Sequence, residues 1–496
     1  MSFLKKYLPY LLLAIGFFII SVPLWLKVDL LPIRLWDEAR NAVNALEMSQ
    51  SHNWLIRTYN GFPEIFETKP PLLIWFQVVS LKIFGYNELA IRMPSVMFSI
   101  LSLVVLYILL FKMTESKLAS FGGALITATS KGFYGEHLGR FGDHEALLVL
   151  ICLFLLLQVY LYSKSQKTIH IYLIALAFCL GVFCKSISIG MLFPGIFLYL
   201  LYDKKIKTIL TSKHFYIAFF AAITPIAAYY IFREQAQPGY LEAVWHGELF
   251  PRFFNTSKSF TFAEHDNGFY FDQLKKYRFI HWVWALPVVL VAPLLLRKAP
   301  KEWVFWVINS LVFLLIISKG TKNDWYLAPA IPMMAGSIAT SAFLFINFKP
   351  KYLIWLLIPL GYLGLKSYDR AYVYAMNPHE LHDEWQTYGI SHFVKDETKQ
   401  NLLSSNVKIV LDSNNVYEPH AFYIKKLKLE KDIKIDRIWY SDIRSKDTIL
   451  LTHQVVFDML EDNYNVSVVD SNRYGAKLVS LAPKGTTALL EVVSVD

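Results

Sequence analysis

Two groups of charged residues near the start of the chain are of the types that proton transfer and phosphate binding require. Asp37 and Glu38 follow a long apolar segment, directly behind Leu35 and Trp36. A carboxylate at the edge of apolar surroundings can have its pKa raised and act as a general base, and we expect this of Asp37. A pair of acidic residues can also cap the helix that follows it, and this structural role competes most strongly for Glu38.

The second group is centred on Lys69, which follows Glu67 and precedes Pro70 and Pro71. The prolines come before a short apolar stretch, residues 72–84, which predicts a helix. Lys69 then has two roles of equal weight. Its ammonium either reaches the headgroups and anchors the helix, or binds a lipid phosphate at the same depth.

A dense polar patch, residues 132–145, lies between two apolar segments. Asp143 is followed by His144 and Glu145 where the next helix should begin, so helix capping is its structural explanation. On the topology argued below, this patch shares the outer face with Asp37. Two acidic sites on one face suggest a cavity that handles hydroxyl-rich or cationic substrates.

The longest loop between apolar segments adds further candidates. Arg252 suits a phosphate, because a guanidinium binds phosphate through two parallel hydrogen bonds. His265 is the candidate metal ligand, but the histidines of this loop lack the close spacing of a local zinc site, so it would need a distant partner such as Glu67. Lys322 and Tyr326 place a basic and a phenolic group on the same face.

The elements that carry these residues have the composition of membrane helices. Of the 496 residues, 55% are hydrophobic and 18% charged, whereas soluble proteins carry about 25% charged residues. Apolar runs of roughly 16–22 residues recur between residues 7 and 365, long enough to cross ~30 Å of hydrocarbon as helices. The net charge of +10 comes from short loops between these runs, which excludes a nucleic-acid footprint. The sequence predicts a polytopic α-helical membrane protein.

Charge also predicts the orientation, because loops rich in Lys and Arg face the cytoplasm. Lys5 and Lys6 precede a first span, residues 7–28, which we expect to be retained because no convincing cleavage site follows it. If residues 72–84 stay at the outer interface, every later basic loop faces inward. The result is about eleven spans, with the N-terminus in the cytoplasm and the C-terminus outside.

From about residue 369 the composition becomes polar and the pattern changes. Short β-rich runs alternate with helix-like stretches, which predicts a small soluble α/β domain, residues 369–496, after a transmembrane domain, residues 1–368. The soluble domain has no glycine-rich phosphate loop or nucleophile elbow, so we expect a structural or partner-binding module. The predicted strands are 407–411, 448–451, 465–469, 476–481 and 488–495, and the predicted helices are 378–395, 420–428 and 454–462.

A set of short motifs spread over most of residues 30–340 matches the pattern of a known protein family. The motifs are Asp37-Glu38-x-Arg40, Lys69-Pro70-Pro71-Leu72, Gly85, Glu88, Arg92-x-Pro94-Ser95, the segment from Arg140 to Asp143, Lys185-Ser186 and Tyr326-x-x-Pro329-x-x-Pro332. In these the chain resembles the dolichyl-phosphate-mannose-protein mannosyltransferase-like superfamily, especially its bacterial branch that includes the lipid A aminoarabinose transferases. The predicted soluble domain lies outside the resemblance.

The resemblance implies a GT-C membrane glycosyltransferase of the bacterial inner membrane. Such an enzyme takes a sugar from a polyprenyl-phosphate carrier and passes it, on the outer face, to a lipid A, glycan or protein hydroxyl acceptor. On matching positions, Asp37 and Asp143 would be the catalytic carboxylates, and Lys69 and Arg252 would hold the carrier phosphate. The other residues expected to bind substrate are Glu38, Arg40, Glu67, Arg92, Arg140, Lys322 and Tyr326.

The family's metal position is altered in this sequence. In the aminoarabinose transferases a glutamate directly precedes the Lys-Pro pair, and a metal can bind there. Here Thr68 occupies that position and Glu67 is displaced by one residue. We therefore predict no certain cofactor and leave a divalent metal ion open.

Two other classes of function are to be weighed against an enzyme. A transporter or flippase for a lipid-linked glycan tends to show internal repeats and ionisable groups at mid-membrane. Here the ionisable residues gather at one face, which favours an enzyme. A non-catalytic scaffold in envelope assembly gains weight only if Asp37, Lys69 and Asp143 lie far apart.

Overall fold

The computed structural model describes residues 2–65, 67–249, 268–290, 299–377, 385–410 and 419–484. Its contacts divide the chain into two units. The helical unit comprises residues 1–28 and 47–377, and the α/β unit comprises residues 29–46 and 378–496. The domain boundary expected at residues 368 and 369 stays a prediction.

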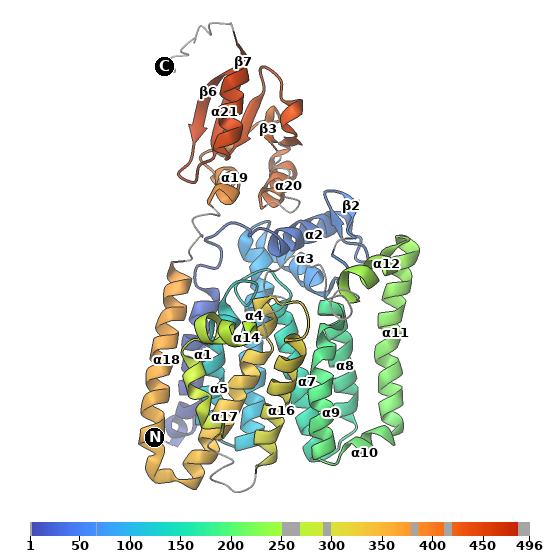
Figure 1. Ribbon diagram of the computed structural model, residues 1–496, viewed down its shortest axis with the longest axis vertical. Coiled ribbons are helices and arrows are strands. Elements are labelled where there is room, and N and C mark those ends of the chain that lie inside the picture. Colours follow the sequence, from blue (N-terminus) through green and yellow to red (C-terminus); the bar gives the residue numbers. More distant parts are fainter. Residues whose placement is uncertain are drawn as a thin grey trace. The chain divides into compact units, whose positions relative to one another are not determined.

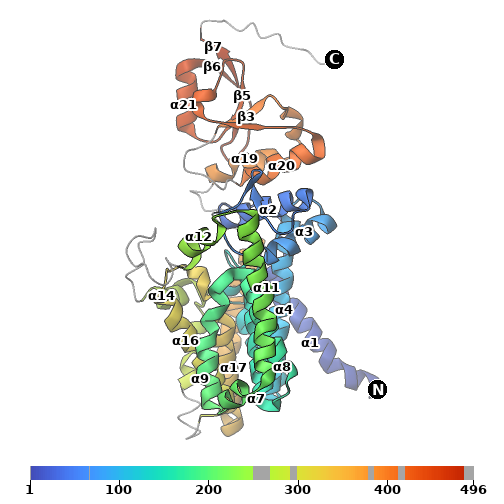
Figure 2. The same ribbon diagram turned by 90° about the vertical axis from the view of Figure 1, so that its right-hand side faces the viewer.

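The helical unit is a bundle of long helices that run roughly alongside one another (Figure 1). Its longer helices are α1 (Ser2–Trp25), α4 (Glu88–Thr114), α5 (Lys117–Ala128), α7 (Glu145–Ser165), α8 (Ile169–Lys185), α9 (Phe193–Tyr202), α11 (Lys213–Ala236), α16 (Lys301–Ile317), α17 (Ala330–Phe348) and α18 (Leu353–Met376). Their apolar side chains form one continuous core. Figure 2 shows the same bundle from the side, with α11 next to α8.

Six helical stretches in the described ranges are long and apolar enough to cross a membrane. They are Tyr7–Trp25, Glu88–Thr114, Glu145–Ser165, Ile169–Tyr202, Lys213–Ala236 and Asp324–Phe348. The chain is thus a multi-pass integral membrane protein, as its composition predicts. The finer count of about eleven spans, made from charge and hydropathy, stays a prediction.

Helix α7 lies at the centre of this bundle and α11 at its edge. In the apolar part of α7, 83% of the residues are buried inside the protein, against 17% in α11. A helix that is apolar all round and covered by other helices belongs to a core, whereas an uncovered one offers its side chains to lipid. The N-terminal end of α7 is therefore covered by neighbouring helices, and it begins two residues after Asp143.

The short helix predicted over residues 72–84 is confirmed as α3 (Leu72–Phe84). Pro71 directly precedes it, and proline lacks the N–H that an earlier helical turn would use. Gly85 ends the helix with φ +78°, a left-handed conformation that glycine adopts readily. Its 13 residues are too few to cross ~30 Å of hydrocarbon, and its interfacial location stays a prediction.

The α/β unit contains a small mixed five-stranded sheet in the order β4-β3-β5-β7-β6. β3 pairs in parallel with β4 and β5, whereas β7 pairs antiparallel with β5 and β6. The strands are β3 (Val407–Val410), β4 (Asp436–Ile438), β5 (Thr448–Leu451), β6 (Tyr464–Ser471) and β7 (Lys477–Pro483), and the helices are α19 (Trp385–Lys395), α20 (His420–Lys431) and α21 (Gln454–Asn463).

Most of these elements lie where the sequence predicts them. The strands at 407–411, 448–451, 465–469 and 476–481 are present within a residue or two. β4 was not predicted, and the strand predicted at 488–495 lies outside the described residues. The unit also contains residues 29–46, which include the start of α2 (Asp37–Ser51).

Candidate functional site

The turn between α5 and α7 holds Asp143 through contacts with two other helices. Gln77 of α3 donates through Nε2 to the Gly142 carbonyl at 3.1 Å, and Ser95 of α4 donates through Oγ to the Asp143 carbonyl at 3.3 Å. A Cβ at Gly142 would lie 2.5 Å from Cγ2 of Ile91, so only glycine allows this close approach. The backbone before α7 is therefore fixed by packing.

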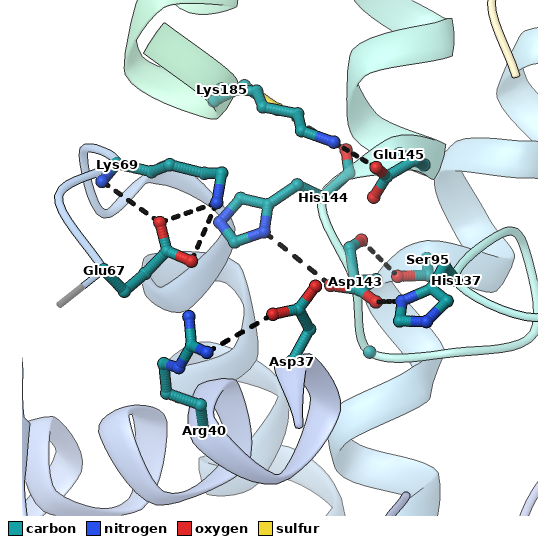
Figure 3. Close-up of polar contacts among 12 residues, drawn as sticks. Asp37, Arg40, Glu67, Lys69, Ser95, His137, Asp143, His144, Glu145 and Lys185 are labelled. Atoms are coloured by element: carbon teal, nitrogen blue, oxygen red, sulfur yellow. Dashed lines mark hydrogen bonds and ion pairs between the residues drawn. The ribbon is translucent and has the colours of Figure 1, made fainter. Parts of the chain in front are cut away.

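The Asp143 carboxylate is buried and lies between two histidines. Its Oδ2 is 2.6 Å from Nδ1 of His137, and its Oδ1 is 3.8 Å from Nδ1 of His144 (Figure 3). Burial by itself would raise the pKa of Asp143, but its hydrogen bonds and charge interactions with His137 and His144 outweigh this and lower the pKa below its usual value. Asp143 is thus an anion at neutral pH.

His137 is held on its other side by an aromatic ring. Its imidazole stacks on Trp325, with ring centroids 4.1 Å apart and planes inclined by 29°. The backbone of His137 has φ +61°, an uncommon conformation for a residue with a side chain. An imidazole fixed between an indole and a carboxylate is well placed to move a proton or to bind a ligand.

Lys69 is the centre of a second cluster, in the segment that leads into α3. Its Nζ lies 2.7 Å from both carboxylate oxygens of Glu67 and 3.7 Å from Oε1 of Glu248. Arg57 donates to the Glu67 carbonyl and lies 4.0 Å from Oε1 of the same residue. The side chains of Lys69 and Glu67 are only 12% and 5% exposed, so their charges are little screened by water.

Four charged side chains of the Lys69 cluster balance one another in charge. Lys69 and Arg57 supply two positive charges, and Glu67 and Glu248 supply two negative ones. Tyr240 adds a fixed neutral contact, because its hydroxyl donates to the Thr68 carbonyl at 2.6 Å. The phosphate of a carrier lipid would bring negative charge to this cluster and would have to compete with Glu67 for the ammonium.

A third buried ion pair joins Lys185, at the end of α8, to Glu145, in the first turn of α7. The Lys185 ammonium also lies 5.1 Å from the centroid of the Tyr326 ring, a cation–π contact. Figure 3 shows Lys185 and Glu145 in the same region as Lys69 and Asp143. Buried charges of both signs therefore gather around Asp143, Lys69 and Lys185 in the helical unit.

An apolar pocket of about 460 Å³ adjoins the Lys69 cluster. It is lined by residues of α8, α11, the 3-10 helix η1 (Ser186–Leu192), α12 (Tyr240–Val244) and the π-helix η2 (Trp245–Leu249). Val244 and Trp245 line the pocket, and Glu248, less than one turn later, contacts Lys69. The pocket is therefore suited to a hydrocarbon chain whose charged end would lie near the lysine.

The two arginines predicted from the family motif contact the end of α1. Arg92 donates to the Val28 carbonyl at 2.8 Å, and Arg140 donates to the Pro23 carbonyl at 2.5 Å. Both are buried, and burial lowers the pKa of Arg140 to about 10. Cations favour the carboxyl end of a helix, which accounts for both positions. Their predicted role in substrate binding stays a prediction.

The α/β unit holds Asp37, Glu38 and Arg40 at the start of α2. Arg40 Nη2 lies 3.5 Å from Oδ1 of Asp37, whose side chain is 33% exposed. The buried Glu38 accepts a hydrogen bond from the backbone N–H of Arg34 at 2.8 Å. The donor precedes α2, so this contact holds Glu38 to the backbone that leads into the helix, and the predicted capping and substrate roles of Glu38 stay predictions.

The remaining predicted residues lie near the end of α16 or outside the described parts of the chain. Lys322 is buried before the 3-10 helix η5 (Asp324–Leu327), and Tyr326 lies under Lys185. Arg252 and His265 lie outside the described residues. Among the predicted residues, the structure brings Lys69 and Glu67 into direct contact.

Several residues of the site were not assigned a role from the sequence. They are Arg57, His137, Trp325 and, as partners of the two lysines, Glu145 and Glu248. The signal for His137 was weak: a polar residue in a glycine-rich turn, six positions before Asp143. Arg57 and Trp325 gave no signal, because only the fold brings them to these clusters.

Comparison with known proteins agrees with this architecture. Residues 68–232 match the family model described as dolichyl-phosphate-mannose-protein mannosyltransferase. The undecaprenyl phosphate-alpha-4-amino-4-deoxy-L-arabinose arabinosyl transferase of Yersinia enterocolitica is 26% identical over 335 residues, 64% of this chain and 57% of that protein. An uncharacterized protein of Aquifex aeolicus is 29% identical over 182 residues, 36% of this chain and 35% of that protein. The chain thus matches less than two thirds of the length of either relative.

A solved structure extends the likeness to almost the whole chain. The crystal structure of ArnT from Cupriavidus metallidurans bound to undecaprenyl phosphate has a TM-score of 0.69 and covers 94% of this chain and 97% of its own. At 12% identity, this likeness concerns the fold. The fold and the family match together relate the chain to the GT-C glycosyltransferases, a class of polytopic membrane enzymes. The predicted resemblance to the dolichyl-phosphate-mannose-protein mannosyltransferase-like superfamily is confirmed.

Proposed function

We propose that this chain transfers a sugar from a polyprenyl-phosphate carrier to a hydroxyl-bearing acceptor. The observation that carries the proposal is the apolar pocket, which adjoins the buried Lys69 cluster through a single turn of chain. A polyprenyl phosphate needs both features, because its hydrocarbon tail favours apolar surroundings and its phosphate favours a cation. The relative from Cupriavidus metallidurans was crystallised with undecaprenyl phosphate, which supports a carrier of this kind.

In the proposed reaction, the bond between sugar C1 and the carrier phosphate oxygen breaks, and its electron pair stays on the phosphate. Negative charge therefore grows on the phosphate in the transition state. The Lys69 ammonium, joined by the predicted phosphate ligand Arg252, would interact more strongly with this state than with the bound carrier. Glu67 holds the ammonium in place until the carrier competes for it.

The acceptor oxygen forms the new bond to C1 and loses its proton. We propose Asp37 as the base that takes this proton, since its side chain is partly exposed at the first turn of α2. We further propose that Asp143, kept anionic by its two histidines, stabilises positive charge on the sugar ring. A single displacement of this kind inverts the configuration at C1.

No cofactor is established for this chain. The proposal does not require a metal ion, but a chelation experiment can test for one. His137 and Asp143 are adjacent and of residue types that bind divalent ions. An ion held there would polarise an oxygen of the substrate. Activity that survives exhaustive chelation, without restoration by added Mg²⁺, Mn²⁺ or Zn²⁺, would exclude a required divalent ion.

We also propose that the protein resides in a bacterial inner membrane. The N-terminus would lie in the cytoplasm, and Asp37 and the α/β unit would lie on the periplasmic side. The support is the inward position this gives to the basic loops. Cysteine labelling from outside should modify a cysteine introduced at the exposed position Trp36, and labelling only after lysis would refute the orientation.

Mass analysis of envelope lipids, glycans and glycoproteins from cells with and without the chain should identify the acceptor and the sugar. Purified protein with that donor and acceptor should then show transfer. Asp37→Asn should abolish transfer while leaving the protein folded and inserted. Wild-type turnover by this variant would refute the role of Asp37, and carrier movement in vesicles that needs no acceptor would instead support a flippase.

A further inference from the structure

The α/β unit includes a segment that is distant from the rest of it in sequence. Residues 29–46 belong to this unit together with residues 378–496. This segment contains the backbone that leads directly into Asp37. Its hydrogen-bond partners therefore show which part of the chain determines where the proposed base lies.

Three consecutive backbone N–H groups before Trp36 are bound by side-chain oxygens. The N–H of Ile33 donates to the Tyr423 hydroxyl at 2.8 Å, and the N–H of Leu35 donates to the Tyr388 hydroxyl at 3.1 Å. The N–H of Arg34, between them, donates to Glu38 at 2.8 Å. Buried backbone groups outside regular secondary structure need such partners, and here the C-terminal region supplies two of the three.

Two further contacts join the same segment to α19. The Arg34 guanidinium lies 5.8 Å from the centroid of the Tyr388 ring, and Lys395 donates through Nζ to the Asp29 carbonyl at 3.1 Å. Tyr388 and Tyr423 are each only 3% exposed. A buried tyrosine has few alternative positions, so its hydroxyl is a fixed point for the backbone that it binds.

The residue directly before Asp37 is in a strained conformation. Trp36 has φ +70°, a region that residues other than glycine, asparagine and aspartate seldom occupy. Its side chain is 49% exposed, so burial of the indole does not explain the strain. Its carbonyl accepts the first hydrogen bond of α2, from the N–H of Arg40 at 2.9 Å. Strain of this kind persists only where neighbouring contacts hold it.

We infer that the C-terminal α/β region positions Asp37, with Tyr388 and Tyr423 holding the backbone of residues 33–35 so that Trp36 turns and α2 begins at Asp37. The inference rests on the proposed role of Asp37 as the base. It gives the region after residue 377 a task in the reaction. Tyr388 and Tyr423 act through Asp37 and are positioning residues.

The first test removes the two hydroxyls in the full-length protein. Tyr388→Phe and Tyr423→Phe, singly and together, should lower kcat, because a small misplacement of a reacting group costs on the order of 10²-fold. The KM for the polyprenyl-phosphate sugar should stay unchanged, since the contacts of the carrier are untouched. Hydrogen exchange at residues 33–40 should become faster. The matched control is Tyr464→Phe in the same unit, whose hydroxyl donates to the Ile443 carbonyl at 3.2 Å; it should behave as wild type.

The second test changes only the conformational preference at position 36, where the exposed side chain can be replaced without loss of core packing. Trp36→Asn and Trp36→Val both remove the indole, but asparagine tolerates positive φ and valine does not. Trp36→Val should lower kcat at least tenfold below Trp36→Asn, which should keep most of the wild-type activity.

The outcomes separate this inference from the proposed function. Full activity of Asp37→Asn would refute the role of Asp37, and the inference with it. An inactive Asp37→Asn combined with wild-type kcat for the double tyrosine variant would refute the positioning role alone. Equal activities of Trp36→Asn and Trp36→Val would also overturn it, even if the tyrosine variants failed to fold.

Discussion

The two ends of α7 carry charged networks of different construction. In its first turn, Glu145 pairs with Lys185, and the two side chains are only 4% and 7% exposed. In its last turn, Lys164 pairs with Glu302 at 2.8 Å, and those side chains are 50% and 20% exposed. Both ends use the same residue types. They differ in whether water reaches the charges.

Two further ion pairs differ in the exposure of the lysine, although Asp203 is itself only 1% exposed. Lys301, which is 55% exposed, pairs with Asp203 at the end of α9, whereas Lys69 and Glu67 are both nearly buried. Burying both partners of an ion pair carries a desolvation cost that their attraction does not always offset, while an exposed pair contributes about 0–1 kcal/mol. A gain in stability alone therefore does not explain why the Lys185–Glu145 and Lys69–Glu67 pairs are buried. Charges held in place at this cost are typical of a functional site.

The largest expected effect is on transfer itself. Lys69→Gln removes the cation proposed to stabilise the leaving phosphate and should reduce kcat on the order of 10²–10³-fold. The measurement is steady-state transfer from a polyprenyl-phosphate sugar. The matched control is Lys82→Gln, an exposed lysine on α3, which should keep wild-type activity. Equal rates for the two variants would contradict a phosphate role for Lys69.

The next largest effect is on stability at the buried end. Glu145→Gln leaves the Lys185 ammonium without its counter-charge and should destabilise the protein by about 3–5 kcal/mol. Denaturant unfolding in detergent measures this. Because the penalty comes from the unpaired charge, Glu145→Gln combined with Lys185→Met should regain most of the loss. A double variant no more stable than Glu145→Gln would show that the two residues do not act as a pair.

A smaller effect depends on pH. The pKa of Asp143 is lowered in the folded protein, so its contribution to stability is present above the unfolded pKa of about 3.9 and is lost as the pH falls further. Asp143→Asn should therefore be less stable than wild type at pH 7, by about 1–3 kcal/mol. The difference should shrink below pH 4. Thermal unfolding across this range would contradict the expectation if the difference stayed constant.

The smallest effect is expected at the exposed end of α7. Lys164→Gln breaks the pair with Glu302, but water screens both charges, so the loss should be below about 1 kcal/mol. The same unfolding measurement as for Glu145→Gln gives a direct comparison. A loss as large as that of Glu145→Gln would remove the distinction between the two ends.

Local sequence signals predicted the elements of the fold but not their partners. Helix α3 follows from its flanking prolines and Gly85, since these residues act on their own backbone. Strand β4, in contrast, is a three-residue strand with two charged side chains, and only its pairing with β3 makes it a strand. The membership of residues 29–46 in the α/β unit depends on contacts across more than three hundred residues.

For the candidate site, too, the sequence indicated individual residues but not the residues that they contact. Lys69 and Glu67 were both singled out for substrate, but their mutual ion pair was not predicted. Asp143 was singled out, but its partner His137 was not, because a turn has no fixed periodicity to read. Arg92 and Arg140 were assigned to substrate from a family motif, and the sequence does not show that both also contact the end of α1.

Those two arginines have a consequence for the maturation of the protein. If a peptidase removed the segment before residue 28, the carbonyls of Pro23 and Lys27 would be lost to Arg140, and that of Val28 would become a loose chain end beside Arg92. Both buried guanidinium groups would then lose these backbone acceptors. These contacts join the first hydrophobic segment to α4 and to the turn before α7, and we expect removal of the segment to destabilise both.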